Sequence, residues 1–299
     1  MGEKTFVSKY AKFLVPFAVI CGSMSGILGS LVSAPAIVIG FGRLTVALPF
    51  FAIPVLVKDM DSIKAMTKRD WIFTILAGIF LFGHFFTWFT AVKLTQVTSA
   101  AVLASLHPLV VLFCTIFIFK RKVSIKQIIA ILFIIFGAGI ITFSDSSAGA
   151  AVGSNPLMGD LFAFVAGVCM GIYFQFGNEA RANVKGSTYV FLCFLACWVC
   201  FGIALLVTQT SPLGYPTSDY LYIVAMAFIC QIGSHALFNL CLGHVNSIYV
   251  STWESGDALF ATFLSIIILA QAPSAVGWLG CIIATAALVY YNYLENKNL

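Results

Sequence analysis

The chain has 299 residues, of which 61% are hydrophobic and only 9% charged, and its mean hydropathy is +1.03. A water-soluble globular domain carries about a quarter charged residues, so the composition excludes a soluble protein and indicates one that lives in lipid. The net charge of +5 is small, and we do not expect nucleic acid to be a partner.

Long apolar stretches follow one another along the whole chain. A bilayer core about 30 Å thick is crossed by a helix of about 20 apolar residues. We predict an all-α membrane protein with ten transmembrane helices, no soluble domain and no long linker. The predicted spans are 11–31, 36–57, 70–92, 97–119, 124–143, 157–180, 187–209, 219–242, 248–270 and 273–293.

The basic residues set the expected orientation. Lys4, Lys9 and Lys12 precede the first span, which lacks a small-residue cleavage site and is interpreted as a retained helix. If the N-terminus is cytoplasmic, every basic residue except Arg43 and Lys93 falls on the cytoplasmic side. The positive-inside rule therefore places both termini in the cytoplasm.

The first three spans contain small residues and two cations. Gly22 to Gly26 reads GSMSG, whose spacing is wrong for a serine-nucleophile turn, so we expect it to allow close helix packing. Arg43 lies in the outer part of the second span, where snorkelling outward or structural pairing is expected, with recognition of a carboxylate as the alternative. Lys93, at the outer end of the third span, is expected to be a solvated anchor.

Polar and aromatic side chains inside the spans are candidates for a substrate site. The alternative for the amides is hydrogen bonding between helices, and for Trp88 and Trp253 it is lipid contact or core packing. The candidates before the ninth span are His84, Trp88, His107, Tyr173, Gln231, His235 and Asn239.

The ninth span contains two carboxyl groups, which are energetically unfavourable inside a membrane. Trp253, Glu254 and Asp257 are spaced i, i+1 and i+4 and share one side of a helix. An acid in lipid is expensive and tends to face a cavity, so we expect Asp257 or Glu254 to line a substrate pathway. Burial favours a neutral carboxyl, which makes both acids candidates for proton coupling, with His107 or His235 as relay.

Three cysteines on one face of the seventh span, Cys193, Cys197 and Cys200, include a C-x-x-C. A zinc or redox site is conceivable there. Because no fourth ligand is evident and small residues commonly pack between membrane helices, we expect no metal and no cofactor.

The second half of the chain repeats the first. An offset of 150 residues aligns Gly83–Phe143 with Gly233–Tyr293 without gaps, and pairs His107 with Asp257. We divide the chain into residues 1–148 and 149–299. Five spans is an odd number, so the second half must run through the membrane in the opposite sense. Inverted repeats are typical of transporters whose substrate site lies near the midplane between the halves.

At this point the sequence resembles the drug/metabolite transporter superfamily, in its ten-helix EamA-type branch. The resemblance is strongest over Ala91–Phe143, with a short outer turn, a small-residue helix containing a proline and a Gly-bearing fifth helix. Two features depart from the family pattern. Pro108 is replaced by Ala258 in the second copy, and Arg121 and Gln271 stand where an acidic residue usually follows the fourth helix of each half.

These observations together predict a secondary carrier. We expect it to move a small polar metabolite, such as an amino acid or another amine-bearing compound, by alternating access through a midplane cavity. A channel or facilitator and, from another class, an intramembrane enzyme are the alternatives, although no protease or esterase motif is found. We expect the protein to work as a monomer in a plasma membrane, which the resemblance implies is bacterial.

Overall fold

A computed structural model describes residues 6–107, 110, 113, 124–148, 153–241, 253 and 257–297. The side chains of residues 6–9, 142, 145–148, 178, 239, 292 and 295–297 lie outside that description. Over the described ranges the secondary structure is helical and contains no strand, as predicted.

The helices follow the predicted spans closely in the first half of the chain. One short helix, α3, was not predicted. The helices of this half are α1 (Phe6–Leu31), α2 (Ala36–Lys58), α3 (Met60–Lys64), α4 (Lys68–Leu94), α5 (Val97–Ala104) and α7 (Ile125–Ala148).

In the second half, the predicted span 219–242 is one continuous rod built from three segments, the middle one a π-helix. The helices of this half are α8 (Pro156–Arg181), α9 (Gly186–Thr208), α10 (Thr217–Met226), the π-helix η3 (Ala227–Ala236), α11 (Leu237–Cys241), α13 (Asp257–Leu269) and α14 (Ala275–Lys297).

Local sequence explains where two helices begin. Thr67 and Asp70 form a capping box at the start of α4, in which each side chain binds the other residue's backbone N–H. Ser124 and Gln127 do the same at the start of α7, at 2.9 and 3.3 Å. These reciprocal bonds satisfy donors that a helix N-terminus otherwise leaves unpaired.

The outer surface of the bundle is apolar. Leu206, Val207 and Ile267 are 80%, 78% and 78% exposed, which would be costly in water and is ordinary in lipid. Within the described ranges, five helices (α1 from Tyr10, α2, α4, α8 and α9) are long and apolar enough to cross a membrane. The count of ten spans stays a prediction.

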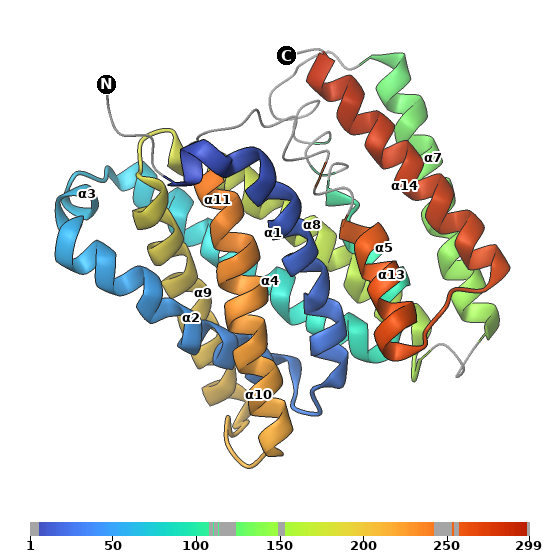
Figure 1. Cartoon of the computed structure of the whole chain (residues 1–299), viewed down its shortest axis with the longest axis horizontal. Helices are drawn as coiled ribbons and strands as arrows, with labels where there is room; N and C mark the ends of the chain where they lie inside the picture. The colour runs from blue at the N-terminus through green and yellow to red at the C-terminus, as the bar shows by residue number, and fades with distance from the viewer. Residues whose placement is uncertain are drawn as a thin grey trace.

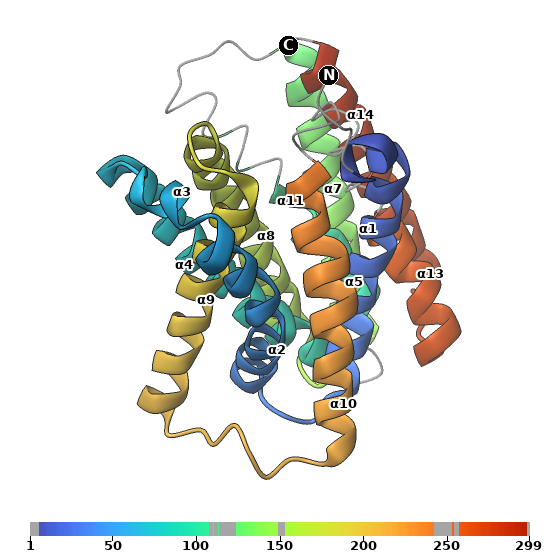
Figure 2. The same cartoon turned by 60° about the vertical axis from the view of Figure 1, so that its left-hand side comes forward.

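Each half of the chain packs mainly against the other. The main contacts join α4 to α8, α7 to α14, α2 to α9, α1 to η3 and α4 to α9. In every pair one helix comes from residues 1–148 and the other from 149–299. Figures 1 and 2 show α7 and α14 side by side at one edge of the bundle.

The connections gather at two ends of the bundle. The start of α1, helix α3 and the α8–α9 connection lie at one end, which we call the basic end because Lys58, Lys64, Arg69 and Lys185 lie there (Figures 1 and 2). The α1–α2 and α9–α10 connections lie at the opposite end.

Candidate functional site

Asp257 is held at the contact between α13 and α1. The Ser23 hydroxyl oxygen lies 2.7 Å from Asp257 Oδ1 and 2.9 Å from the carbonyl oxygen of Val19. Gly22 makes room for Ser234 of η3, because a Cβ there would lie 2.8 Å from the Ser234 hydroxyl oxygen, while it would lie at an ordinary contact distance of 3.6 Å from Asp257 Oδ1. An acid from one half of the chain thus meets a hydroxyl from the other half.

The π-helix η3 packs against the same part of α1. A π-helical turn is wide and uncommon, and such turns are frequent at functional sites. Gln231, in the middle of η3, is fully buried, and neither Oε1 nor Nε2 has a hydrogen-bond partner among the residues that the structure describes. The Gln231 amide thus has donors and acceptors that are not used within the protein. Leaving such a buried amide unpaired lowers the stability of the fold by about 1–3 kcal/mol.

Arg43 does not snorkel, which was one of the two roles expected for it, the other being structural pairing. Its side chain is fully buried, because the guanidinium carbon lies 4.3 Å from the ring centre of Phe85 and 5.5 Å from that of Phe89. Its one hydrogen bond runs from Nη1 to the Ser25 hydroxyl at 3.4 Å, and Nε and Nη2 have no partner. No carboxylate in the described part of the chain pairs with it.

The predicted residues His84 and His235 meet around Phe85. The His84 Nδ1 lies 2.9 Å from the carbonyl oxygen of Ala166 in α8, and since a carbonyl only accepts, Nδ1 carries the hydrogen. His84 is therefore an anchor between α4 and α8. The His235 ring packs edge-on against Phe85, with 5.3 Å between ring centres. Phe85 is also the residue whose ring face contacts the Arg43 guanidinium.

His107 and Tyr173 belong to the surroundings of α8. The His107 ring lies 5.5 Å from that of Phe174, and Tyr173 is 2% exposed and packs beside the same phenylalanine. The described contacts of His107 are thus with α8, whereas those of Asp257 are with α1. The pairing of these two residues at a common midplane site stays a prediction.

Trp88 is buried in the protein interior, whereas Trp253 is partly buried. Trp88 is 8% exposed, and its ring fills the space beside Gly26, where a Cβ would lie 2.9 Å from the indole. Trp253 packs against a small cluster of Ala11, Val15 and Cys241. Glu254 lies outside the described residues, and Asn239 lies in α11 with its side chain outside the description.

Sequence reasoning missed the roles of Ser23 and Ser25. The GSMSG segment signalled close packing, and Gly22 and Gly26 do allow it. The two serines between these glycines are the residues that contact Asp257 and Arg43. One stretch of α1 therefore touches both Asp257 and Arg43.

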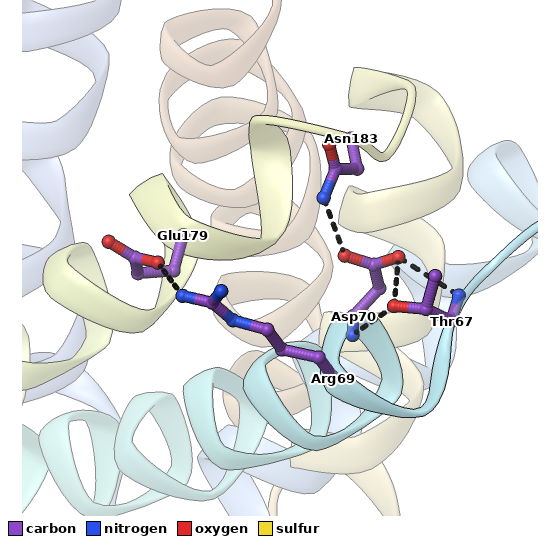
Figure 3. Close-up of polar contacts among 5 residues, drawn as sticks. All are labelled: Thr67, Arg69, Asp70, Glu179 and Asn183. Carbon is purple, nitrogen blue, oxygen red and sulfur yellow. Dashed lines mark hydrogen bonds and ion pairs between the residues drawn. The ribbon is translucent and has the colours of Figure 1, made fainter.

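Charged side chains connect the halves of the chain at the basic end (Figure 3). Arg69 binds Glu179 at 2.7 Å, and the Asn183 amide donates to Asp70 at 3.2 Å. Asp59 also accepts from Lys185 at 2.8 Å, and this hydrogen bond holds the pKa of Asp59 below its ordinary value.

At the opposite end, Lys93 is not simply a solvated anchor. Its ammonium donates to the carbonyl oxygens of Val32 and Ala34 in the α1–α2 connection. Asp219, at the start of α10, accepts from the Ser33 hydroxyl at 2.7 Å and from the Ala34 N–H at 2.9 Å. This connection is therefore fixed by one charge from each half.

Comparisons with known proteins agree with this architecture. The model described as the EamA-like transporter family matches the chain twice, over residues 10–143 and 157–293. A Clostridium kluyveri protein described as an "Uncharacterized transporter" is 25% identical over 258 residues, which cover 82% of this chain and 79% of that protein.

A solved structure described as "Crystal structure of protein" shares the fold, with a TM-score of 0.65 and 17% identity over 97% of this chain and 99% of its own. The resemblance seen in the sequence is confirmed by the family matches, which span most of the 299 residues. The chain therefore belongs to the EamA-like transporter family and is a multi-pass membrane transport protein.

Proposed function

We propose that this transporter is a secondary carrier that moves a small polar metabolite, such as an amino acid or another amine-bearing compound, by alternating access. The proposal depends chiefly on Asp257, an acid placed where α13 of the second half meets α1 of the first. A carboxylate at this position offers a binding partner for an amine, and the cost of an acid in lipid calls for a function.

The proposed inverted repeat is supported by the helix pairing. Each of α2, α5 and α7 packs against the helix that follows it by five in the predicted order of spans, namely α9, α13 and α14. A pair of halves related in this way can rock about the centre of the bundle and open to one end and then the other.

Ser23 gives Asp257 a way to exchange a proton. The hydroxyl has one hydrogen and three acceptors in reach, Asp257 Oδ1 at 2.7 Å, the Val19 carbonyl at 2.9 Å and the Asp257 carbonyl at 3.3 Å. With Asp257 charged, Ser23 donates to the carboxylate. With Asp257 protonated, the carboxyl donates to Ser23, which then donates to Val19. Both protonation states are satisfied, so we propose proton coupling at Asp257, with Glu254 as a second candidate.

Flux across liposomes tests the function. Purified protein is reconstituted, and counterflow of each of the twenty amino acids and a set of small amines is measured with and without an imposed pH gradient. A substrate should show saturable counterflow that the gradient changes. Single-channel currents, or no counterflow for any compound, would contradict a carrier, and indifference to the gradient would contradict coupling.

The Asp257→Asn substitution tests the site. Asn keeps the shape and the acceptor for Ser23 but removes the charge and the exchangeable proton. We expect counterflow of amine-bearing substrates to fall at least about 10-fold, since a hydrogen bond to a charged group contributes about 1.5–3 kcal/mol. Thr262→Ser is the matched control on the same helix. Unchanged counterflow in Asp257→Asn would remove this residue from the mechanism.

The setting in the cell follows from the charge pattern. Lys58, Lys64 and Arg69, which lie in α2, α3 and α4, and Lys185, which directly precedes α9, share the basic end of the bundle. We propose that this end is cytoplasmic, that both termini lie there, and that a single chain is the working unit in the plasma membrane. Labelling of single exposed cysteines from one side of a sealed cell tests this orientation. We also propose that the chain transports without catalysing a covalent reaction.

A further inference from the structure

We propose that the Arg43 guanidinium binds the carboxylate of the transported substrate, so that the substrate is an amino-acid-like zwitterion held between Arg43 and Asp257. This inference rests on the proposed carrier function and names its substrate class. Four observations carry it, and each concerns a side chain within the described part of the bundle.

First, Arg43 has unused hydrogen-bonding capacity. A guanidinium carries five N–H donors in a planar fork that matches a carboxylate. Here one donor makes a 3.4 Å contact to the Ser25 hydroxyl, longer than the usual 2.9–3.0 Å, and Nε and Nη2 have no partner. The side chain is nevertheless fully buried. The vacant donors are on two of its three nitrogens, enough for a bidentate contact.

Second, the positive charge is not neutralised. No ion pair joins Arg43 to an acid within the described ranges, and besides the Ser25 hydroxyl the guanidinium contacts the faces of Phe85 and Phe89. Cation–π contact offsets only part of the cost of taking a charge out of water. A buried cation without an anion is retained for a reason, and an anionic ligand supplies that anion.

Third, Arg43 and Asp257 contact the same stretch of α1. Asp257 Oδ1 lies 3.6 Å from the Cβ position of Gly22, and Arg43 contacts Ser25. Asp257 also accepts from Ser23, two residues before Ser25, so both groups contact the same turn of α1, and no ion pair joins them in the described part of the chain. An α-amino acid carries its amine and its carboxylate on one carbon and presents one group to each side chain.

Fourth, a second unpaired polar group lies on the π-helix that faces α1. The Gln231 amide is fully buried, and both its oxygen and its nitrogen lack partners. Arg43 and Gln231 come from helices that pack together, α2 and η3. An amide offers both a donor and an acceptor, so it serves a zwitterion better than a purely apolar ligand.

A purely structural role predicts something different. If Arg43 only holds α2 against α4 through Phe85 and Phe89, then Arg43→Met should lower the unfolding temperature of the ligand-free protein. If Arg43 instead binds an anionic ligand, its charge has no anionic partner in the ligand-free protein. Removing that charge by Arg43→Met should then leave the unfolding temperature unchanged or raise it. Thermal unfolding in detergent separates the two, and a clear loss of stability in Arg43→Met argues against the anion role.

Ligand binding gives the decisive measurement. Thermal unfolding of the full-length protein is followed with each of the twenty L-amino acids and with the primary amide of each, which keeps the amine and lacks the carboxylate. A ligand bound to the folded state raises the unfolding temperature. We expect at least one amino acid to stabilise the wild type and its amide to bind about 10- to 100-fold more weakly.

Variants assign the difference to Arg43. In Arg43→Gln the amino acid should lose affinity by about 10- to 100-fold while the amide is unaffected. Arg43→Lys should fall between, since it keeps the charge and loses the fork. The matched control is Arg69→Gln, the same change at an exposed ion pair, which should alter neither ligand. If Arg43→Gln fails to fold, the comparison of Arg43→Lys with the wild type carries the test.

The outcomes are distinguishable from failure of the carrier proposal. Equal binding of amino acids and amides, or no stabilisation by any amino acid, overturns the assignment of Arg43. If simple amines without a carboxylate still show counterflow in liposomes, the carrier function stands while the zwitterion assignment falls. If amino acids bind through Arg43 but nothing is transported, the assignment stands and the carrier proposal falls.

Discussion

At the scale of single residues, the hydrogen atom of Ser23 decides how Asp257 is satisfied. A serine hydroxyl donates once, so it can serve the carboxylate or the Val19 carbonyl but not both. The state of one hydroxyl is thereby tied to the state of one acid. Such a link matters in a protein interior, where an unsatisfied charged group is far costlier than in water.

Ser23→Ala should change the pH dependence of transport. Without the hydroxyl, the charged form of Asp257 loses a donor, and we expect the proton-dependent part of the uptake profile to move to higher pH and uptake at neutral pH to fall about 10-fold. Ser23→Thr keeps the hydroxyl and should retain the wild-type profile. Liposome uptake between acid and alkaline pH measures this, and superimposable profiles for Ser23→Ala would rule out the link.

The sequence allowed Asp257 to be predicted but not its partner. An acid in an apolar run is conspicuous, because its cost in lipid does not depend on what surrounds it. Ser23 lies 234 residues away in the chain, and a serine in a membrane helix is ordinary. The burial of Arg43 was missed for a related reason, since it depends on Phe85 and Phe89 of another helix.

At the scale of helices, the pair α7–α14 shows how small residues set a packing distance. A Cβ on Gly137 would lie 2.6 Å from the backbone nitrogen of Ala284, and one on Gly280 would lie 2.9 Å from the carbonyl oxygen of Gly137. These neighbours are backbone atoms, which cannot move aside as a flexible side chain can. The two helices are therefore as close as their backbones permit.

Two glycines on α7 offer a matched pair of substitutions. Gly137→Ala should lower the free energy of unfolding by about 1–3 kcal/mol, because the new methyl group meets the α14 backbone. Gly139→Ala places its methyl group where nothing lies within 4 Å, and should be neutral or stabilise by up to about 1 kcal/mol through helix propensity. Denaturation in detergent measures both, and equal effects would contradict this packing.

Helix positions were well predicted, and helix types were not. Runs of about 20 apolar residues located α1, α2, α4, α8 and α9 because span length follows from bilayer thickness. The π-helix of residues 227–236 was read as ordinary α-helix, since its apolar composition carries no mark of the wider turn. The short helix α3 was missed because five residues show no periodicity.

At the scale of the whole molecule, polar contacts join the two halves at the basic end. Asp59 with Lys185 and Arg69 with Glu179 each connect residues more than 100 positions apart in sequence. If the carrier opens at this end, these contacts must separate. The ion pairs are largely exposed, with Lys185 and Arg69 side chains 65% and 71% accessible, so breaking them costs little.

Acid should weaken the Asp59 contact. The pKa of Asp59 is lowered by its hydrogen bond with Lys185, so folding gains stability from this group above its unfolded pKa and loses that gain as pH falls through its folded pKa. We expect wild type to unfold at a slightly higher temperature than Asp59→Asn near neutral pH, and the two to converge in acid. A difference that persists in acid would point to a cause other than ionisation.

A link across the basic end should stop transport. In a background without reactive native thiols, Arg69→Cys with Glu179→Cys places one thiol on each side of the contact shown in Figure 3. A short bifunctional thiol reagent should abolish counterflow, while the monofunctional reagent should not. If the bifunctional reagent contains a disulfide, a reductant cleaves the link and should restore counterflow. Full counterflow in the linked protein would contradict opening at this end.

The connection between α1 and α2 also bears on how the protein is made. Ser33 is bound by Asp219, which is added 186 residues later during synthesis. At about 5–20 residues per second, the nascent chain waits about 10 to 40 s before its first hairpin receives this partner. During that interval Lys93, added 59 residues after Ala34, already binds the corner through the Val32 and Ala34 carbonyl oxygens, and the Ser33 hydroxyl and the Ala34 N–H are left to water until Asp219 arrives.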